Sequence, residues 1–154
     1  MLLSGWKNIG IDPAMNIRTA IILAFSLATT SAVADPTILT GKVTHVRDGD
    51  TIEVGKTPIR LSGVSAPELK EPLGPQSKQF MRDLVLGKRV RCELIGKKTY
   101  DRFVGTCFLG DRDIGRAIIR SGLALDCPRF SGGRYAGEET AAARSAIKLP
   151  RHCG

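Results

Sequence analysis

The chain has 154 residues, of which 42% are hydrophobic, and it carries a formal net charge of +8. This length suits one domain of ordinary size, and the sequence has no internal repeat or low-complexity segment, which excludes a repeat protein. The excess of basic over acidic residues favours a polyanionic partner such as nucleic acid, although a requirement for solubility alone also accounts for this excess.

The N-terminal part has the features of a leader. A basic start after Met15, an apolar run over residues 20–27 and small residues at 32–34 are typical of a secretory signal peptide. The apolar run is too short to span a membrane comfortably. We therefore expect a leader over residues 1–34, either long or with Met15 as the true start. The mature domain, residues 35–154, is then secreted or periplasmic, basic (+7 once Lys7, Arg18 and Asp12 are removed) and not inserted in a membrane.

Alternating apolar and polar residues predict three strands in the first half of the domain, over residues 37–46, 51–54 and 59–64. A proline-rich loop follows, and then an amphipathic helix over residues 76–86. Pro75 suits its first turn, and Gly87 suits its end.

The second half is predicted to hold two strands, at 89–94 and 102–109, and two helices, at 114–121 and 135–147. Asp113 is the expected N-cap of the first of these helices. Five short strands with one helix between the third and fourth fit a closed OB-type β-barrel carrying three helices, an α+β fold. A five-stranded sheet packed against helices is the alternative.

All four cysteines lie in the mature domain, and an even number in an exported chain predicts two disulfides. Three pairings are possible. Cys92 and Cys107 fall on the apolar faces of neighbouring predicted strands and can lie opposite each other, so we expect Cys92–Cys107 and Cys127–Cys153. Zinc is the competing interpretation, but the chain has no C-x-x-C motif and its two histidines are not at ligand spacing.

One stretch, residues 48–68, carries the candidate chemistry. Asp48 and Asp50 flank a glycine, a turn over residues 55–58 returns the chain as a strand that carries Arg60, and the stretch ends at Glu68. If the two strands pair as a hairpin, Asp50, Arg60 and Glu68 converge. Two carboxylates and a guanidinium can together hold a hard cation and a phosphate.

Four motifs occur in one order: DGDT at 48–51, IRLSGVSAPE at 59–68, YDR at 100–102 and DIGRAIIRSGLA at 113–124. Together they resemble the thermonuclease (staphylococcal-nuclease-like) family, whose members are OB barrels that cleave DNA and RNA phosphodiesters with calcium. The resemblance implies a secreted, calcium-dependent nuclease with DNA and/or RNA as partner, which we expect to be a monomer.

The resemblance also implies a role for each matched residue. Asp50 resembles the calcium ligand with Asp48 in support, Arg60 and Arg102 resemble the arginines that hold the scissile phosphate, Glu68 resembles the glutamate that activates water, and Tyr100 resembles a tyrosine of the nucleotide pocket. The chemistry agrees with these roles. Guanidinium groups and a divalent ion offset the charge that grows on the phosphate oxygens, and a carboxylate accepts a proton from the attacking water.

Three departures from the family pattern bear on activity. Ser65 stands where most of the family has a calcium-binding aspartate, and a neutral hydroxyl is a weaker ligand, so we expect weaker calcium binding. Asp101 replaces a glycine and either pairs with Arg102 or repels the phosphate. Residues 128–130 read Pro-Arg-Phe where a second pocket tyrosine is expected. These departures support an alternative, a catalytically weakened or inactive OB-fold module that binds nucleic acid or another polyanion.

Overall fold

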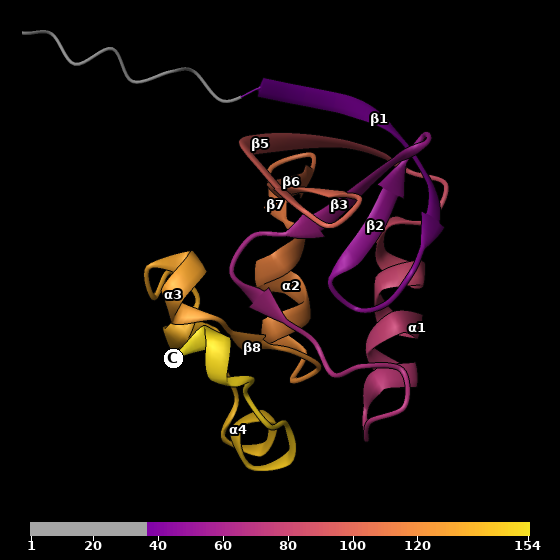
Figure 1. Ribbon diagram of the computed structural model, residues 1–154. Helices are drawn as coiled ribbons and strands as arrows, with labels where there is room; N and C mark the ends of the chain where they lie inside the picture. Colours follow the sequence, from indigo (N-terminus) through magenta and orange to yellow (C-terminus); the bar gives the residue numbers. More distant parts are fainter. Residues whose placement is uncertain (1–36) are drawn as a thin grey trace, which may run out of the picture. The chain divides into compact units, whose positions relative to one another are not determined.

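The computed structural model describes residues 37–154 (Figure 1), so the predicted leader lies outside the described residues. The long strands are β1 (Thr37–Val46), β2 (Thr51–Val54), β3 (Thr57–Leu61), β5 (Arg89–Thr99) and β6 (Arg102–Leu109). Three short strands are β4 (Val64–Ser65), β7 (Arg112–Asp113) and β8 (Leu125–Asp126). The helices are α1 (Gly74–Val85), α2 (Ile114–Arg120), α3 (Pro128–Ser131) and α4 (Ala141–Ala146), with 3₁₀ turns η1 (Ala136–Glu138) and η2 (Arg151–Cys153).

The long strands close into a barrel. Their order is β3-β2-β1-β5-β6, and a parallel pairing of β3 with β6, which sets Arg60 opposite Val104, joins the two ends. All the other pairings between these strands are antiparallel. The predicted five-stranded OB-type barrel is therefore confirmed, and the open-sheet alternative is wrong because β3 and β6 are bonded to each other.

The core lies between the barrel and two helices. β1, β2 and β3 each contribute side chains to this core, and Val43, Ile52 and Ile59 are fully buried. The apolar faces of α1 and α2 complete the same cluster with Met81 and Ile118. Figure 1 shows both helices on the same side of the barrel. This core packs against β2 and β3, and the candidate site begins at the ends of these strands.

Two strands differ in extent from their predictions. β3 begins at Thr57, because Pro58 takes part in the strand opposite Glu53 and the turn is confined to residues 55–56. It ends at Leu61, so the predicted strand over residues 59–64 is interrupted by a turn at residues 62–63 before β4. β5 continues to Thr99 beyond a register shift between Leu94 and Lys98. This extension lacks the apolar alternation on which the prediction depended, and it carries the end of β5 past the body of the barrel.

The predicted helix over residues 135–147 is wrong as a single element. It is divided into η1 and α4, because Thr140 is extended and its hydroxyl accepts a hydrogen bond from the Ala143 N–H at 3.0 Å, which starts a new helix. The preceding α3 was not predicted. It begins at Pro128, whose fixed φ suits a first helical turn.

Tyr135 ties this C-terminal region to the barrel. Its hydroxyl donates to Asp113 Oδ2 at 2.8 Å, while Asp113 Oδ1 caps α2. Burial, followed by the Asp113 contact, raises the pKa of Tyr135, so the hydroxyl remains a neutral donor at ordinary pH. Tyr135→Phe is expected to lower the free energy of unfolding by about 1 kcal/mol in urea denaturation. Tyr100→Phe, at a side chain that is 92% exposed, is the matched control and should change nothing.

Two disulfides join Cys92 to Cys107 and Cys127 to Cys153, which is the pairing expected from the sequence. The first connects directly opposite residues of β5 and β6. The second connects the start of α3 to η2. Such bonds are typical of proteins from an oxidising compartment. Within residues 37–154, no helix is long and apolar enough to cross a membrane.

Candidate functional site

Asp50, at the end of the β1–β2 turn, is held by donors from three segments. Its carboxylate forms an ion pair with Arg60 of β3 and accepts hydrogen bonds from the Thr51 hydroxyl and the Ala66 N–H, each at 3.1 Å. The side chain of Asp50 is almost wholly buried, whereas that of Arg60 is 22% exposed. Of the predicted convergence of Asp50, Arg60 and Glu68, the contact between Asp50 and Arg60 is present, and the guanidinium still reaches solvent.

Arg102 joins this group through Thr51. Its Nη1 donates to Thr51 Oγ1 at 3.1 Å, and the same hydroxyl donates to Asp50. The parallel pairing of β3 with β6 brings the two arginines to one end of the barrel. Thr51 had no role assigned from the sequence, although it is the last residue of the DGDT motif. Two cations thus lie beside one carboxylate, an arrangement suited to an anionic ligand.

Asp48 supplies a second carboxylate. Its Oδ1 accepts a hydrogen bond from the Asp50 N–H at 3.0 Å. Burial, together with the charge of Asp50, raises the pKa of Asp48 from its ordinary 3.8 to about 6. The two neighbouring carboxylates repel each other when both are charged. A hard divalent ion offsets this repulsion, so the pair is a suitable ligand set for such an ion.

The raised pKa of Asp48 predicts a pH-dependent stability. The folded state holds this proton more tightly than the unfolded chain, so the stabilisation is present below about pH 4 and is lost as the pH rises through about 6. Asp48→Asn keeps the oxygen that accepts from Asp50. Without divalent ions, it should be more stable than the wild type by about 1 kcal/mol at pH 7 and equal to it near pH 4. Urea denaturation across this range tests the prediction, and an equal difference at both ends would contradict it.

Gly49 allows the acidic turn, residues 48–50, to pack directly against α1. A Cβ at this position would lie 1.8 Å from Ser77 Oγ and 2.7 Å from the Ala66 Cβ, so no larger residue fits without movement of the turn. We expect Gly49→Ala to destabilise the protein by about 2 kcal/mol and to impair the site as well. Gly137→Ala, where a Cβ meets no atom within 4 Å, is the control for thermal unfolding and should have little effect.

Glu68 lies on the exposed bend between β4 and α1, two residues beyond Ala66. Glu71 fixes this bend: its Oε2 accepts from the Glu68 N–H, and its own N–H donates to the Glu68 carbonyl, both at 2.8 Å. Gly74 allows the close approach, since a Cβ there would lie 2.0 Å from the Glu68 oxygen. Among the side chains that the structure describes, the Glu68 carboxylate has no hydrogen-bond or ion-pair partner, which leaves it available to a bound molecule.

The turn between β5 and β6 carries Tyr100 and Asp101. Tyr100 has a left-handed backbone, with φ of 58°, and its ring centroid lies 6.0 Å from the Arg102 guanidinium carbon. Asp101 forms an ion pair with Arg47 at 2.7 Å, and this arginine also binds Glu53. The sequence predicts that Asp101 either pairs with Arg102 or repels the phosphate. In the structure Asp101 pairs with Arg47, and this pairing lowers the pKa of Asp101. No sequence pattern indicates Arg47 as the partner of Asp101, because it lies 54 positions away along the chain.

Ser65 is buried in β4, where it pairs with Leu125 of β8. Within the described part of the chain, one group of three potential metal-ligating side chains occurs, formed by Cys127, His152 and Cys153. Its two cysteines are joined in a disulfide, so zinc binding there is disfavoured. At the Asp50 end of the barrel, the carboxylates that approach one another are Asp48 and Asp50.

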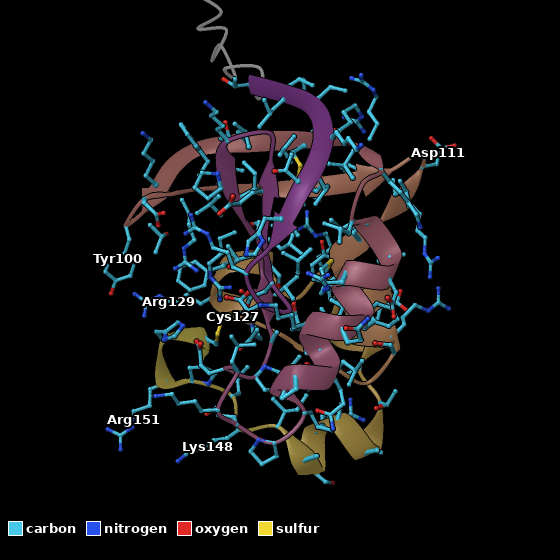
Figure 2. All side chains as sticks on the ribbon, turned by 90° about the vertical axis from the view of Figure 1, so that its right-hand side faces the viewer. Tyr100, Asp111, Cys127, Arg129, Lys148 and Arg151 are labelled. Atoms are coloured by element: carbon cyan, nitrogen blue, oxygen red, sulfur yellow. A yellow bond between two sulfur atoms is a disulfide. The ribbon has the colours of Figure 1, made fainter. Side chains whose placement is uncertain are left out.

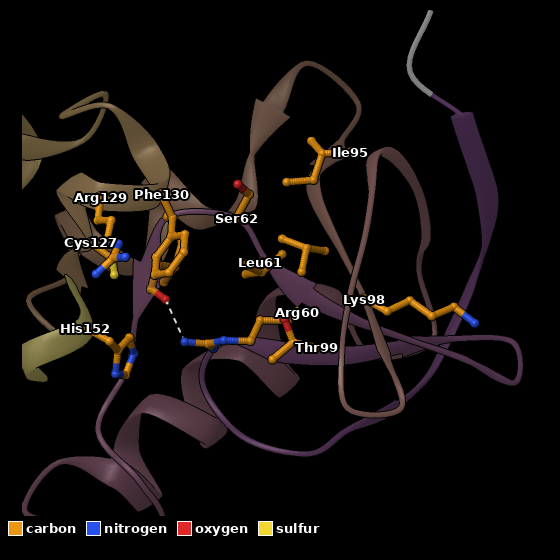
Figure 3. A pocket seen from close by; sticks show the side chains of 13 residues that line it. Arg60, Leu61, Ser62, Ile95, Lys98, Thr99, Cys127, Arg129, Phe130 and His152 are labelled. Atoms are coloured by element: carbon orange, nitrogen blue, oxygen red, sulfur yellow. Dashed lines mark hydrogen bonds between the residues drawn. The ribbon is translucent and has the colours of Figure 1, made fainter. Parts of the chain in front are cut away.

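A cavity of about 300 Å³ lies beside Arg60 (Figure 3). Its walls come from β3, the end of β5 and the C-terminal region, and include Ile95, Thr99 and Phe130. Ile95 and Phe130 are about half exposed although both are large and apolar. Figure 2 shows Tyr100, Arg129 and Arg151 projecting from one side of the molecule and Asp111 from the other. Exposed apolar groups and cations thus share one face.

The fold defines the class, a small OB-type barrel with an acidic turn and two arginines at one end. Residues 58–145 match the family described as staphylococcal nuclease homologues, and the chain belongs to this family. The succinoglycan biosynthesis protein ExoI of Rhizobium meliloti (strain 1021) is 34% identical over 135 residues, which cover 80% of this chain and 69% of that protein.

Two other relatives are named as endonucleases. The probable endonuclease LCL3 of Pyricularia oryzae is 28% identical over 151 residues, covering 73% of this chain and 59% of that protein. An uncharacterized endonuclease of Escherichia coli O157:H7 is 36% identical over 89 residues, covering 54% and 58%. The chain thus spans only part of each relative. The family supports a nuclease-type function with nucleic acid as substrate.

Proposed function

We propose that this protein is an exported, calcium-dependent nuclease that hydrolyses phosphodiester bonds of DNA and/or RNA. The observation that carries the proposal is the connected group of Asp50, Arg60, Thr51 and Arg102 at one end of the barrel. Structural stability alone does not require two arginines around one buried carboxylate, whereas phosphate binding does use them. The two disulfides support export.

The donor set fits a calcium ion. Asp48 and Asp50 would hold it with hard carboxylate oxygens, and the hydroxyl of Ser65 is a further candidate ligand. When bound, the ion supplies positive charge against the phosphate oxygens. The loss of an aspartate at position 65 leaves fewer charged ligands, so calcium binds more weakly than the family pattern implies.

The remaining residues act on the phosphodiester itself. Arg60 and Arg102 are permanently charged forks that bind two phosphate oxygens each and stabilise the charge that develops during attack. Glu68 accepts a proton from the attacking water, since its carboxylate is exposed and not engaged by other described residues. Tyr100, beside Arg102, contacts the nucleotide.

Cleavage of single-stranded DNA by the purified protein, with calcium or with excess chelator, tests this function. We expect fragments to accumulate with calcium and cleavage to stop with chelator. Equal cleavage in both conditions, or none in either, would contradict the proposal. Repurification must leave the specific activity unchanged, which controls for a contaminating nuclease.

A second candidate is a binding module with little or no catalysis, and the burial of a serine at position 65 favours it. This module would bind nucleic acid in a salt-sensitive way without turnover. Ser65→Asp distinguishes the two functions. Restored calcium affinity should raise the cleavage rate of a working nuclease, and it should leave a pure binding module inactive.

A further inference from the structure

Two segments near the end of the chain carry basic residues and no acidic ones. Residues 127–137 and 140–153 contain five lysine or arginine residues in total and no aspartate or glutamate. The acids between these segments, Glu138 and Glu139, already form ion pairs with arginines. The positive charge of the two segments is therefore largely unbalanced.

Three of these basic side chains form a surface on one side of the molecule. Arg129, Lys148 and Arg151 are exposed, and none of them takes part in an ion pair with a residue in the range 37–154. Figure 2 shows all three on the side where Tyr100 lies and away from Asp111. We call these three residues the C-terminal cationic surface.

The last segment, residues 147–153, is attached to the rest of the domain at two points. Cys153 is bonded to Cys127, the residue directly before α3. Leu149 packs against a small apolar core that Leu73, just before α1, also contacts. The cations of this segment are thus presented from a fixed backbone, which reduces the conformational entropy that is lost when a ligand binds.

The C-terminal cationic surface continues from the candidate site. Arg129 lines the same cavity as Arg60, and Figure 3 shows both side chains there. A nucleic acid strand carries a phosphate at every nucleotide, so a strand with one phosphate on Arg60 has further phosphates for cations beyond the site. Unpaired arginine and lysine side chains suit such phosphates by charge.

We propose that the C-terminal cationic surface binds backbone phosphates of a nucleic acid strand beyond the scissile one. The protein then prefers extended strands to short ones. Phosphate contacts carry no sequence information, so they raise affinity without a preference among bases. This inference rests on the proposed function, because the scissile phosphate is taken to lie between Arg60 and Arg102.

Binding of a fluorescent single-stranded oligonucleotide of about 12 nucleotides tests this surface, measured by anisotropy in excess chelator between about 50 and 200 mM salt. Each phosphate contact to a single strand contributes about 0.7 to the slope of log K against log salt concentration. Lys148→Ala and Arg151→Ala should each reduce the magnitude of this slope by about 0.7. Each should also weaken binding about fivefold at about 0.1 M salt.

Arg112→Ala is the matched control, because it removes the same charge elsewhere. Arg112 is exposed and directly follows Asp111, which lies on the other side of the molecule in Figure 2. This variant should leave the slope unchanged and alter affinity less than about twofold. If Arg112→Ala weakened binding as much as Lys148→Ala, the effect would reflect net charge, and the proposed surface would be wrong.

Substrate length gives a second test, with cleavage in calcium as the measurement. A dinucleotide has one phosphodiester, which occupies only the site at Arg60 and Arg102. Lys148→Ala and Arg151→Ala should therefore cleave it with the wild-type kcat/KM, whereas their kcat/KM for the longer oligonucleotide should fall about fivefold. Equal losses on both substrates would place the effect at the cleavage site and overturn the inference.

Wild-type affinity and slope in both variants would overturn the C-terminal cationic surface while leaving the proposed nuclease intact. Loss of binding to anionic phospholipid vesicles, with oligonucleotide binding unchanged, would assign the surface to a membrane and also overturn the inference. A wild-type protein that neither binds the oligonucleotide nor cleaves the dinucleotide would contradict the proposed function, and the inference with it.

Discussion

Glu68→Gln is expected to lower the rate of phosphodiester cleavage by about 10²–10⁴-fold, because the amide has the size of the carboxylate but does not accept a proton from water. Binding of single-stranded DNA should be nearly unchanged, since the bend around Glu68 is held by backbone contacts with Glu71 and Gly74. Single-turnover cleavage with saturating protein separates the chemical step from binding.

The control for this experiment is Asp111→Asn, which removes an exposed acid from the turn between β6 and β7. Figure 2 shows Asp111 on the side of the molecule away from Tyr100. It should cleave at the wild-type rate. If Glu68→Gln retained full activity, another group would have to activate water. If both variants lost activity equally, the effect would reflect net charge and not a role in catalysis.

Arg60→Ala is expected to lower the free energy of unfolding by about 3 kcal/mol in the absence of divalent ions. The reason is that Asp50 is 5% exposed and would be left in a buried place without its ion-pair partner. Calcium should restore part of this loss, since the ion supplies the missing positive charge at the same carboxylate. Thermal unfolding with chelator and with calcium measures both effects.

Arg91→Ala is the matched control, because Arg91 pairs with Glu93 on the exposed surface of β5. Loss of such a surface pair should cost less than about 1 kcal/mol and should not respond to calcium. An Arg60→Ala protein as stable as Arg91→Ala would show that Asp50 does not depend on the guanidinium. Equal recovery of both variants in calcium would show that the ion binds elsewhere.

The sequence predicts the barrel well where local patterns decide the structure. β1, β2 and β6 have their predicted bounds. The start of α2 after Asp113 is also as predicted, since the carboxylate accepts from the Arg116 N–H as an N-cap should. Local spacing likewise brings Asp50 and Arg60 together, because a short hairpin connects them.

The remaining features depend on contacts between distant parts of the chain. The division of the last predicted helix follows from the attachment of Tyr135 to Asp113 and from the cap at Thr140. The pairing of Asp101 with Arg47 crosses between two turns that no local pattern connects. His152 has no motif of its own, and only the closed disulfide shows that it reaches the cavity.

The central claim is tested most directly by two measurements on the same protein. One is the dependence of the cleavage rate on calcium concentration, and the other is calcium binding measured by calorimetry. If Asp50, Arg60, Glu68 and Arg102 form one working site, the calcium concentration that half-saturates cleavage will equal the calorimetric Kd, and Asp50→Asn will abolish both. Cleavage that proceeds in chelator, or calcium binding by Asp50→Asn with wild-type affinity, would contradict it.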